Sequence, residues 1–158
     1  MTSLGLGINP GSVNAVDPLL TCTMKEFEMP WVILVDDDED DRFLIQTAFR
    51  QPGCTCLLQA VSSGHDLFQL LAESVGLPSL LLLDLNMPLM NGFEVLKHLR
   101  AHIDYRSIPV IILTTSDGQR DYQRACALGA ASFLTKPPTL TQLTKVLSQV
   151  KQDWLVDK

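Results

Sequence analysis

The stretch LLLLDLNMP, residues 80–88, contains four consecutive leucines that end at a single carboxylate. A short, wholly apolar run of this kind is typical of a parallel strand that is buried on both faces of a sheet. Residues 32–35 and 110–113 form two further runs of the same character. Each of the three runs is followed directly by polar residues, so the sequence predicts a buried sheet whose strands end in polar side chains.

Segments with helical spacing of apolar residues separate these runs. Capping sequences support three helix starts: Asp38, Asn91 with Glu94, and Thr139 with Gln142. Regular alternation of strands and helices predicts an α/β protein with a (βα)5 doubly wound parallel sheet and right-handed crossovers. We predict helices near residues 39–50, 64–73, 92–101, 118–128 and 140–156, and weaker strands at 55–61 and 131–134.

The composition fits one ordinary domain and argues against two classes of partner. The chain has 158 residues, 46% of them hydrophobic, and a formal net charge of −6. Because phosphate backbones and anionic lipid surfaces select basic proteins, we expect neither nucleic acid nor a membrane as a partner. No apolar run is long enough to span a bilayer and no signal-peptide pattern is present, so we expect a cytoplasmic protein.

The first 29 residues differ from the rest of the chain. They are rich in glycine and proline, carry few charges and show no sustained period, so we interpret residues 1–29 as a flexible N-terminal extension. Residues 30–158 would then form the single folded domain. The cysteines contain no C-x-x-C pair, and we expect reduced thiols rather than a disulfide framework at Cys22, Cys54, Cys56 and Cys126.

Polar side chains stand at the ends of the strands, where a parallel α/β sheet binds its ligands. Asp36 and Asp37 follow the first strand, Asp84 the third, Thr114 the fourth and Lys136 the last. Crowded carboxylates repel one another, and a hard divalent cation such as Mg²⁺ relieves that repulsion. A carboxylate beside such a cation can act as a nucleophile on phosphorus, while a lysine and a hydroxyl neutralise the phosphoryl oxygens.

Six short motifs lie along this framework: Val35-Asp36-Asp37, the DLNMP of residues 84–88, Asn91-Gly92, the TTS of residues 114–116, Gly129-Ala130 and Lys136-Pro137. In order and spacing they resemble the receiver domains of two-component response regulators, over about residues 31–156. A narrower resemblance is to the stand-alone receivers that serve bacterial phytochrome histidine kinases. The resemblance implies a flavodoxin-like strand order, 2-1-3-4-5.

The resemblance also implies a role for each residue of the strand-end cluster. Asp84 would be the phosphoacceptor, and Lys136 would pair with the phosphoryl group and with Asp84. Asp37 would bind Mg²⁺ directly, and Asp36 directly or through water. Asn86 would offer its backbone carbonyl to the same ion.

Further positions are expected to shape the switch. Thr114 would hydrogen-bond a phosphoryl oxygen, and Phe133 lies where the family often has a switching aromatic, usually a tyrosine. Pro137 is expected to follow a cis peptide bond. Three departures affect the switch and the rate of dephosphorylation: Phe133 lacks a hydroxyl, Thr115 is bulkier than the small residue often found there, and Pro138 adds a second proline.

The implied partners are a sensor histidine kinase or a phosphotransfer protein as phosphodonor, and a downstream protein that the sequence does not name. A homodimer through the fourth helix, fifth strand and fifth helix of the family is plausible. Such a protein is not an enzyme in the usual sense, because it catalyses only its own phosphotransfer and dephosphorylation.

Other interpretations remain for parts of the sequence. A pseudo-receiver would have the same fold but bind partners without phosphorylation. A phosphatase of the haloacid dehalogenase type needs a second aspartate two residues after its nucleophile, where this chain has Asn86. We expect Asp40 and Asp41 to be a solvated first helical turn. His98 and His102 have the spacing of a metal pair but no carboxylate that completes the motif, so we expect them to face solvent.

Overall fold

The computed structural model describes residues 30–50 and 56–155, and the expectations for residues 1–29, Cys22 and Cys54 lie outside these ranges. Strands and helices alternate along the described chain. Their bounds are β1 Trp31–Val35, α2 Glu39–Phe49, β2 Leu57–Val61, α3 Gly64–Glu73, β3 Leu80–Leu83, α4 Gly92–Ala101, β4 Val110–Thr114, α5 Gln119–Ala127, β5 Ser132–Thr135 and α6 Leu140–Trp154.

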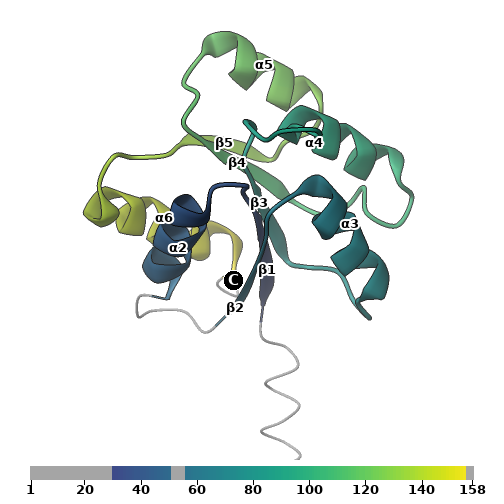
Figure 1. Cartoon of the computed structure of the whole chain (residues 1–158), viewed down its shortest axis with the longest axis horizontal. Helices are drawn as coiled ribbons and strands as arrows, with labels where there is room; N and C mark the ends of the chain where they lie inside the picture. Colours follow the sequence, from purple (N-terminus) through teal and green to yellow (C-terminus); the bar gives the residue numbers. More distant parts are fainter. Residues whose placement is uncertain (1–29, 51–55, 156–158) are drawn as a thin grey trace, which may run out of the picture.

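The strands form one parallel sheet in the order β2-β1-β3-β4-β5. Helices α2 and α6 cover one face of the sheet, and α3, α4 and α5 cover the other (Figure 1). The predicted doubly wound α/β fold and its strand order are therefore confirmed. The helices lie within two residues of their predicted bounds, with α6 ending at Trp154.

The four leucines of β3 are completely buried because the strand faces a helical layer on each side. Leu81 and Leu83 pack in the core under α3, α4 and α5, and Leu80 and Leu82 pack in the core under α2 and α6. A strand in this position needs apolar residues at every position rather than at alternate ones. The edge strands β2 and β5 are less buried, which explains why the sequence predicts them more weakly.

Side chains cap the helix starts close to the acidic residues. Asp38 accepts a hydrogen bond from the backbone N–H of Asp41, and Asn91 forms a reciprocal capping box with Glu94. Both helices therefore begin at fixed points directly after β1 and after the loop that follows β3.

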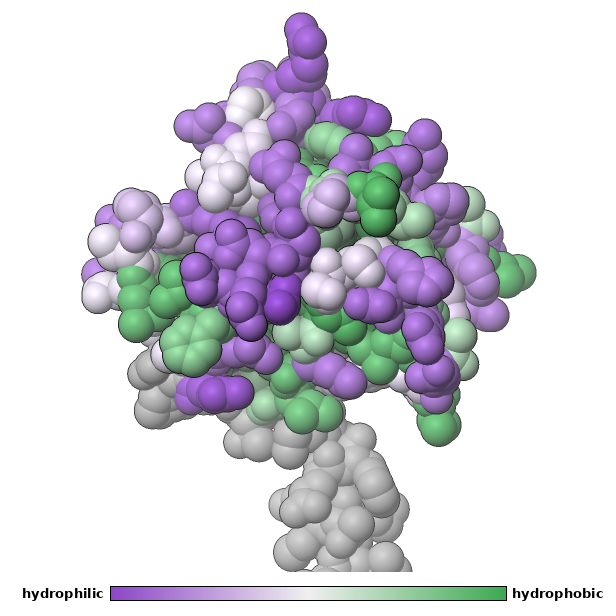
Figure 2. Space-filling model, in the orientation of Figure 1, coloured by the Kyte–Doolittle hydropathy of each residue, from purple (hydrophilic) through white to green (hydrophobic). Residues whose placement is uncertain are grey.

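The surface of the molecule is mixed in character. Hydrophilic residues dominate the face shown in Figure 2, and apolar residues form separate small patches between them. Within the described ranges, no helix has both the length and the apolar character that crossing a bilayer requires.

Candidate functional site

The carboxyl ends of β1 and β3 bring three carboxylates together. The backbone N–H of Asp36 donates to Val61 O and that of Asp84 donates to Val35 O, so both residues extend the sheet by one position. Asp36 and Asp84 are buried, whereas Asp37 is exposed. One carboxylate oxygen from each of the three lies within 4.8 Å of the others. Oxygen ligands in this arrangement suit a hard divalent cation such as Mg²⁺.

Burial dominates the ionisation of the two inner carboxylates. It raises the pKa of Asp36, against the opposing effects of a hydrogen bond and the positive charge from Lys136. It also raises the pKa of Asp84, although the charge of Lys136 and a hydrogen bond from Thr114 act in the other direction. The raised pKa values mean that the interactions with Lys136 do not fully offset the cost of burying the two charged carboxylates.

Lys136 extends from the end of β5 into the same site. Its backbone N–H donates to Thr114 O at 2.6 Å, which fixes the lysine beside the end of β4. Its Nζ lies 2.6 Å from Asp36 Oδ2, 2.8 Å from Asp41 Oδ2 and 3.7 Å from Asp84 Oδ2. Burial alone would lower the pKa of Lys136, but its hydrogen bonds to Asp36 and Asp41 raise it above the ordinary value.

The structure changes two of the expectations about this site. The expectation that Asp41 is simply solvated is wrong, because the third residue of α2 pairs its carboxylate with Lys136, although the side chain stays 34% exposed. Asp40, its neighbour, is exposed as expected. The expected cis bond before Pro137 is also wrong: the described chain contains no cis peptide bond, and trans is the intrinsically favoured isomer for a bond to proline.

Thr114 and Asn86 complete the inner surface of the site. Thr114 is fully buried, and its hydroxyl accepts from Asn86 Nδ2 and from the Ser116 backbone N–H, each at 3.4 Å. The Asn86 backbone N–H lies 3.4 Å from Asp84 Oδ1, so the loop after β3 folds back over the carboxylate. These contacts tie the acceptor loop to the end of β4.

Phe133 lies in β5. Its ring is half-buried and packs on the α5 residue Tyr122, with the ring centroids 5.7 Å apart. Tyr122 was not singled out in the sequence, because a single aromatic residue on a polar helix carries no distinctive pattern. The switching role of Phe133 stays a prediction.

His98 and His102 are exposed but have aromatic neighbours. His98 lies edge-on to Phe68, and His102 stacks on Tyr105 at 4.1 Å between ring centroids. Neither belongs to a group of metal-ligating side chains in the described part of the chain. Their position agrees with the expected surface role.

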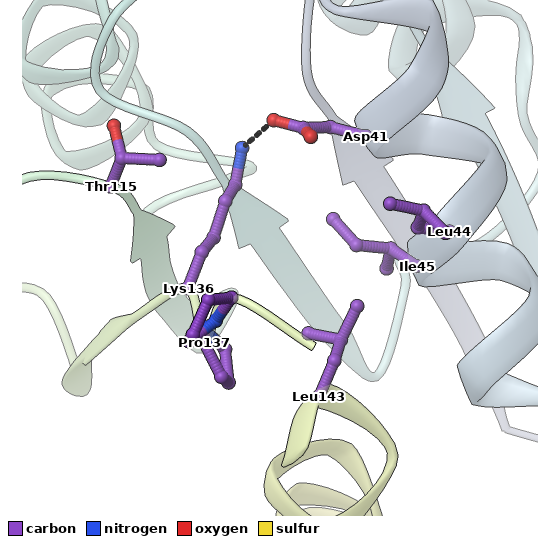
Figure 3. Close-up of a pocket in the computed structure, with 8 residues that line it drawn as sticks. Asp41, Leu44, Ile45, Thr115, Lys136, Pro137 and Leu143 are labelled. Carbon is purple, nitrogen blue, oxygen red and sulfur yellow. Dashed lines mark hydrogen bonds and ion pairs between the residues drawn. The ribbon is translucent and has the colours of Figure 1, made fainter. Parts of the chain in front are cut away.

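A cavity of about 360 Å³ lies beside the site, between α2 and α6 (Figure 3). Leu44, Ile45 and Leu143 form its apolar wall. Lys136 and Asp41 meet at its edge, so their ion pair lies between this cavity and the acidic group.

Comparisons with known proteins agree with this geometry. Residues 32–148 match the response regulator receiver domain family. The chain is 34% identical to the probable methanogenesis regulatory protein FilR2 of Methanothrix harundinacea, over 82% of this chain and 87% of that protein. It is 31% identical to the response regulator Rcp1 of Synechocystis, over 78% and 88% respectively. The crystal structure of the Mn²⁺-bound form of Rcp1 superposes with a TM-score of 0.73 at 29% identity, covering 82% of this chain and 96% of that one.

A further solved structure is that of the phosphorylated cyanobacterial phytochrome response regulator RcpA. It superposes with a TM-score of 0.75 at 29% identity and covers 80% of this chain and 94% of that one. The family match, the relatives and the strand order all point to one conclusion. The chain belongs to the response regulator receiver domain family.

Proposed function

We propose that this chain accepts a phosphoryl group on Asp84 from a partner histidine kinase or phosphotransfer protein, and signals through contacts that depend on this modification. The observation that carries the proposal is the position of the Asp84 carboxylate. It lies at the buried end of β3, in one group with Asp36 and Asp37 and 3.7 Å from the Lys136 ammonium. Receivers are signalling proteins rather than enzymes that turn over an external substrate, which agrees with this role.

The chemistry requires one bond to form and one to break. An Asp84 carboxylate oxygen attacks the phosphorus of a phosphohistidine, and the new P–O bond replaces the P–N bond. The imidazole leaves with the electron pair and takes a proton from solvent. Lys136 and Thr114 neutralise and hydrogen-bond the phosphoryl oxygens, because both side chains border Asp84.

A divalent cation fits the donor set of this site. Asp36, Asp37 and Asp84, with the backbone carbonyl of Asn86, would hold Mg²⁺, which would neutralise negative charge on the transferring group. The burial of Asp36 and Asp84 supports this assignment, because burial raises the pKa of both carboxylates and a bound cation would stabilise their charged forms. The Mn²⁺-bound form of Rcp1 gives further support from a relative.

The partners follow from the relatives. RcpA is described as a phytochrome response regulator, which supports a phytochrome-type sensor kinase as the phosphodonor. The face formed by α5, β5 and α6, which corresponds to the fourth helix, fifth strand and fifth helix of the family, is our proposed dimer or output surface. We place the protein in the cytoplasm, with residues 30–158 as one receiver domain.

Labelling with acetyl phosphate and Mg²⁺ tests the acceptor. The unmodified protein should gain one hydroxylamine-sensitive phosphoryl group, and Asp84→Asn should gain none. Asp153→Asn is the matched control, because Asp153 lies near the end of α6 and contacts Gln149 rather than the site. Full labelling of Asp84→Asn would contradict the assignment. An unmodified protein that resists both acetyl phosphate and kinases would favour a phosphorylation-independent binding module.

A further inference from the structure

Asp41 is held in place by the first turn of α2. Its backbone N–H donates to the side chain of the capping residue Asp38 at 3.1 Å. From this fixed backbone the carboxylate points out of the helix toward Lys136, as Figure 3 shows, with 2.8 Å between Asp41 Oδ2 and Lys136 Nζ. The contact joins two side chains that are 95 positions apart in the sequence, and it follows from the position at which α2 begins.

The lysine ammonium has three N–H donors, and two of them are occupied. Asp36 takes one at 2.6 Å and Asp41 takes another at 2.8 Å. Asp84 Oδ2, at 3.7 Å, is beyond hydrogen-bonding distance. The Lys136 side chain is 8% exposed and that of Asp36 is fully buried, whereas that of Asp41 is 34% exposed, so water weakens the contact with Asp41 more than the contact with Asp36. In this arrangement the ammonium hydrogen-bonds to Asp36 and Asp41 and makes only a longer ion pair with Asp84.

The two carboxylates that hold Lys136 differ in their other contacts. Asp36 belongs to the group of oxygens that fits a divalent cation, so a cation bound there would share its charge. Asp41 does not belong to that group, and its charge is balanced by Lys136 alone among the contacts described here. If a cation is bound by Asp36, Asp37 and Asp84, Asp41 is therefore the carboxylate that still competes for the Lys136 ammonium.

We propose that Asp41 is a positioning residue that holds Lys136 in a resting position, hydrogen-bonded to Asp41 rather than to Asp84, and so opposes phosphorylation. This inference rests on the proposed function, since Lys136 must reach the phosphoryl group on Asp84. Each phosphorylation then requires Lys136 to exchange its contact with Asp41 for a phosphoryl oxygen. Removal of the Asp41 charge makes that exchange easier and also removes a negative charge close to an incoming anion.

Binding of beryllofluoride, a phosphoryl analogue, tests the proposal by calorimetry in the presence of Mg²⁺. Asp41→Asn keeps the size of the side chain and the backbone bond to Asp38. We expect it to bind beryllofluoride about three- to tenfold more tightly than the unmodified protein, the effect of one nearby charge at partial screening. Asp41→Ala, which cannot accept a hydrogen bond from Lys136, should act in the same direction.

Asp40→Asn is the matched control, since it makes the same charge change in the same turn at an exposed position. We expect it to change beryllofluoride affinity less than twofold. Mg²⁺ alone should bind Asp41→Asn no more tightly than the unmodified protein, because a negative charge has been removed. A general structural effect would not increase the affinity for beryllofluoride while leaving the affinity for Mg²⁺ unchanged or lower.

Two outcomes separate this inference from the proposed function. If the unmodified protein binds beryllofluoride in an Asp84-dependent way but Asp41→Asn binds no better than Asp40→Asn, the role of Asp41 is overturned and the function stands. If Asp84→Asn binds beryllofluoride as well as the unmodified protein does, the phosphoacceptor assignment is overturned, and the role of Asp41 with it.

Discussion

Gly92 packs directly against the backbone carbonyl of Asp84. A β-carbon at Gly92 would overlap that oxygen and would lie 2.8 Å from the Cα of Leu85. The backbone N–H of Gly92 donates to Leu85 O at 3.0 Å, so the first residue of α4 is joined to the acceptor loop at this contact. Only a residue without a side chain allows the helix to start so close to the acceptor.

Gly92→Ala should therefore lower the free energy of unfolding by about 1–3 kcal/mol, because the backbone must shift to admit the methyl group. Urea unfolding measures this change. Gly76→Ala is the control, since a β-carbon there would meet nothing within 4 Å. Equal stabilities of the two variants would show that the contact between α4 and the loop is not as close as described.

The raised pKa of Asp84 predicts a dependence of stability on pH in the metal-free protein. Burial makes the folded protein hold this proton more tightly than the unfolded chain. Asp84 therefore contributes stability below its unfolded pKa of about 4, and this contribution is lost as the pH rises through its raised pKa. In chelator, Asp84→Asn should melt above the unmodified protein at pH 8, and the difference should shrink toward pH 5.

Thermal melts of the two proteins across this range check the prediction. The comparison cancels the titrating groups that do not interact with Asp84, whereas Asp36 and Lys136 respond to the loss of its charge. A difference in melting temperature that stays constant from pH 8 to pH 5 would mean that the Asp84 pKa is not raised.

Arg100 joins the end of α4 to two loops. Its guanidinium donates to the carbonyl oxygens of Gly129, Arg106 and Ile108 at 2.8–3.1 Å. A lysine presents one point charge and cannot reach all three, so Arg100→Lys should lose about 1–3 kcal/mol of stability. Arg120→Lys, at an exposed position of α5, should change stability little. Equal denaturant midpoints for the two variants would contradict the bridging role.

Neither tryptophan of the described chain touches the proposed cation group. Trp31 begins β1, and five residues at ~3.3 Å each put it roughly 15 Å from Asp36; its indole N–H donates to Gln59. Trp154 lies at the end of α6. Titration with Mg²⁺ should therefore raise the melting temperature and leave the intrinsic fluorescence almost unchanged. Strong quenching by Mg²⁺ alone would place the ion elsewhere.

The sheet and the position of the site could be predicted because their signals are local. A short apolar run such as Leu80–Leu83 is typical of a strand covered by helices on both faces of the sheet. A polar residue directly after it lies at the carboxyl end of that strand, where a parallel sheet binds its ligands. The apolar pattern of the edge strand β2 is weaker because fewer of its side chains are buried, and Leu57, for example, is 55% exposed. The sequence therefore predicts the buried central strands more clearly than the partly exposed edge strands.

The partner of Asp41 could not be predicted, because the six acidic residues from Asp36 to Asp41 are chemically alike. Which acidic residue of α2 reaches Lys136 depends on the rotation of that helix, and the contact between Asp38 and the Asp41 N–H fixes the rotation only in the folded chain. The bond before Pro137 is a similar case, since cis and trans forms differ by only about 0.5–1 kcal/mol.

The ion pair between Asp36 and Lys136 joins residues that are 100 positions apart. Every strand pair in the sheet is parallel, so each pair needs a crossover connection before it can form. The side chains of the site, which come from different strand ends, are therefore brought together only by contacts between residues far apart in the sequence. During synthesis Asp36 and Asp41 are made long before Lys136, the residue that pairs with both. The contacts of Lys136 with Asp36, Asp41 and Asp84 therefore form only when β5, the last strand in the sequence, has joined the sheet.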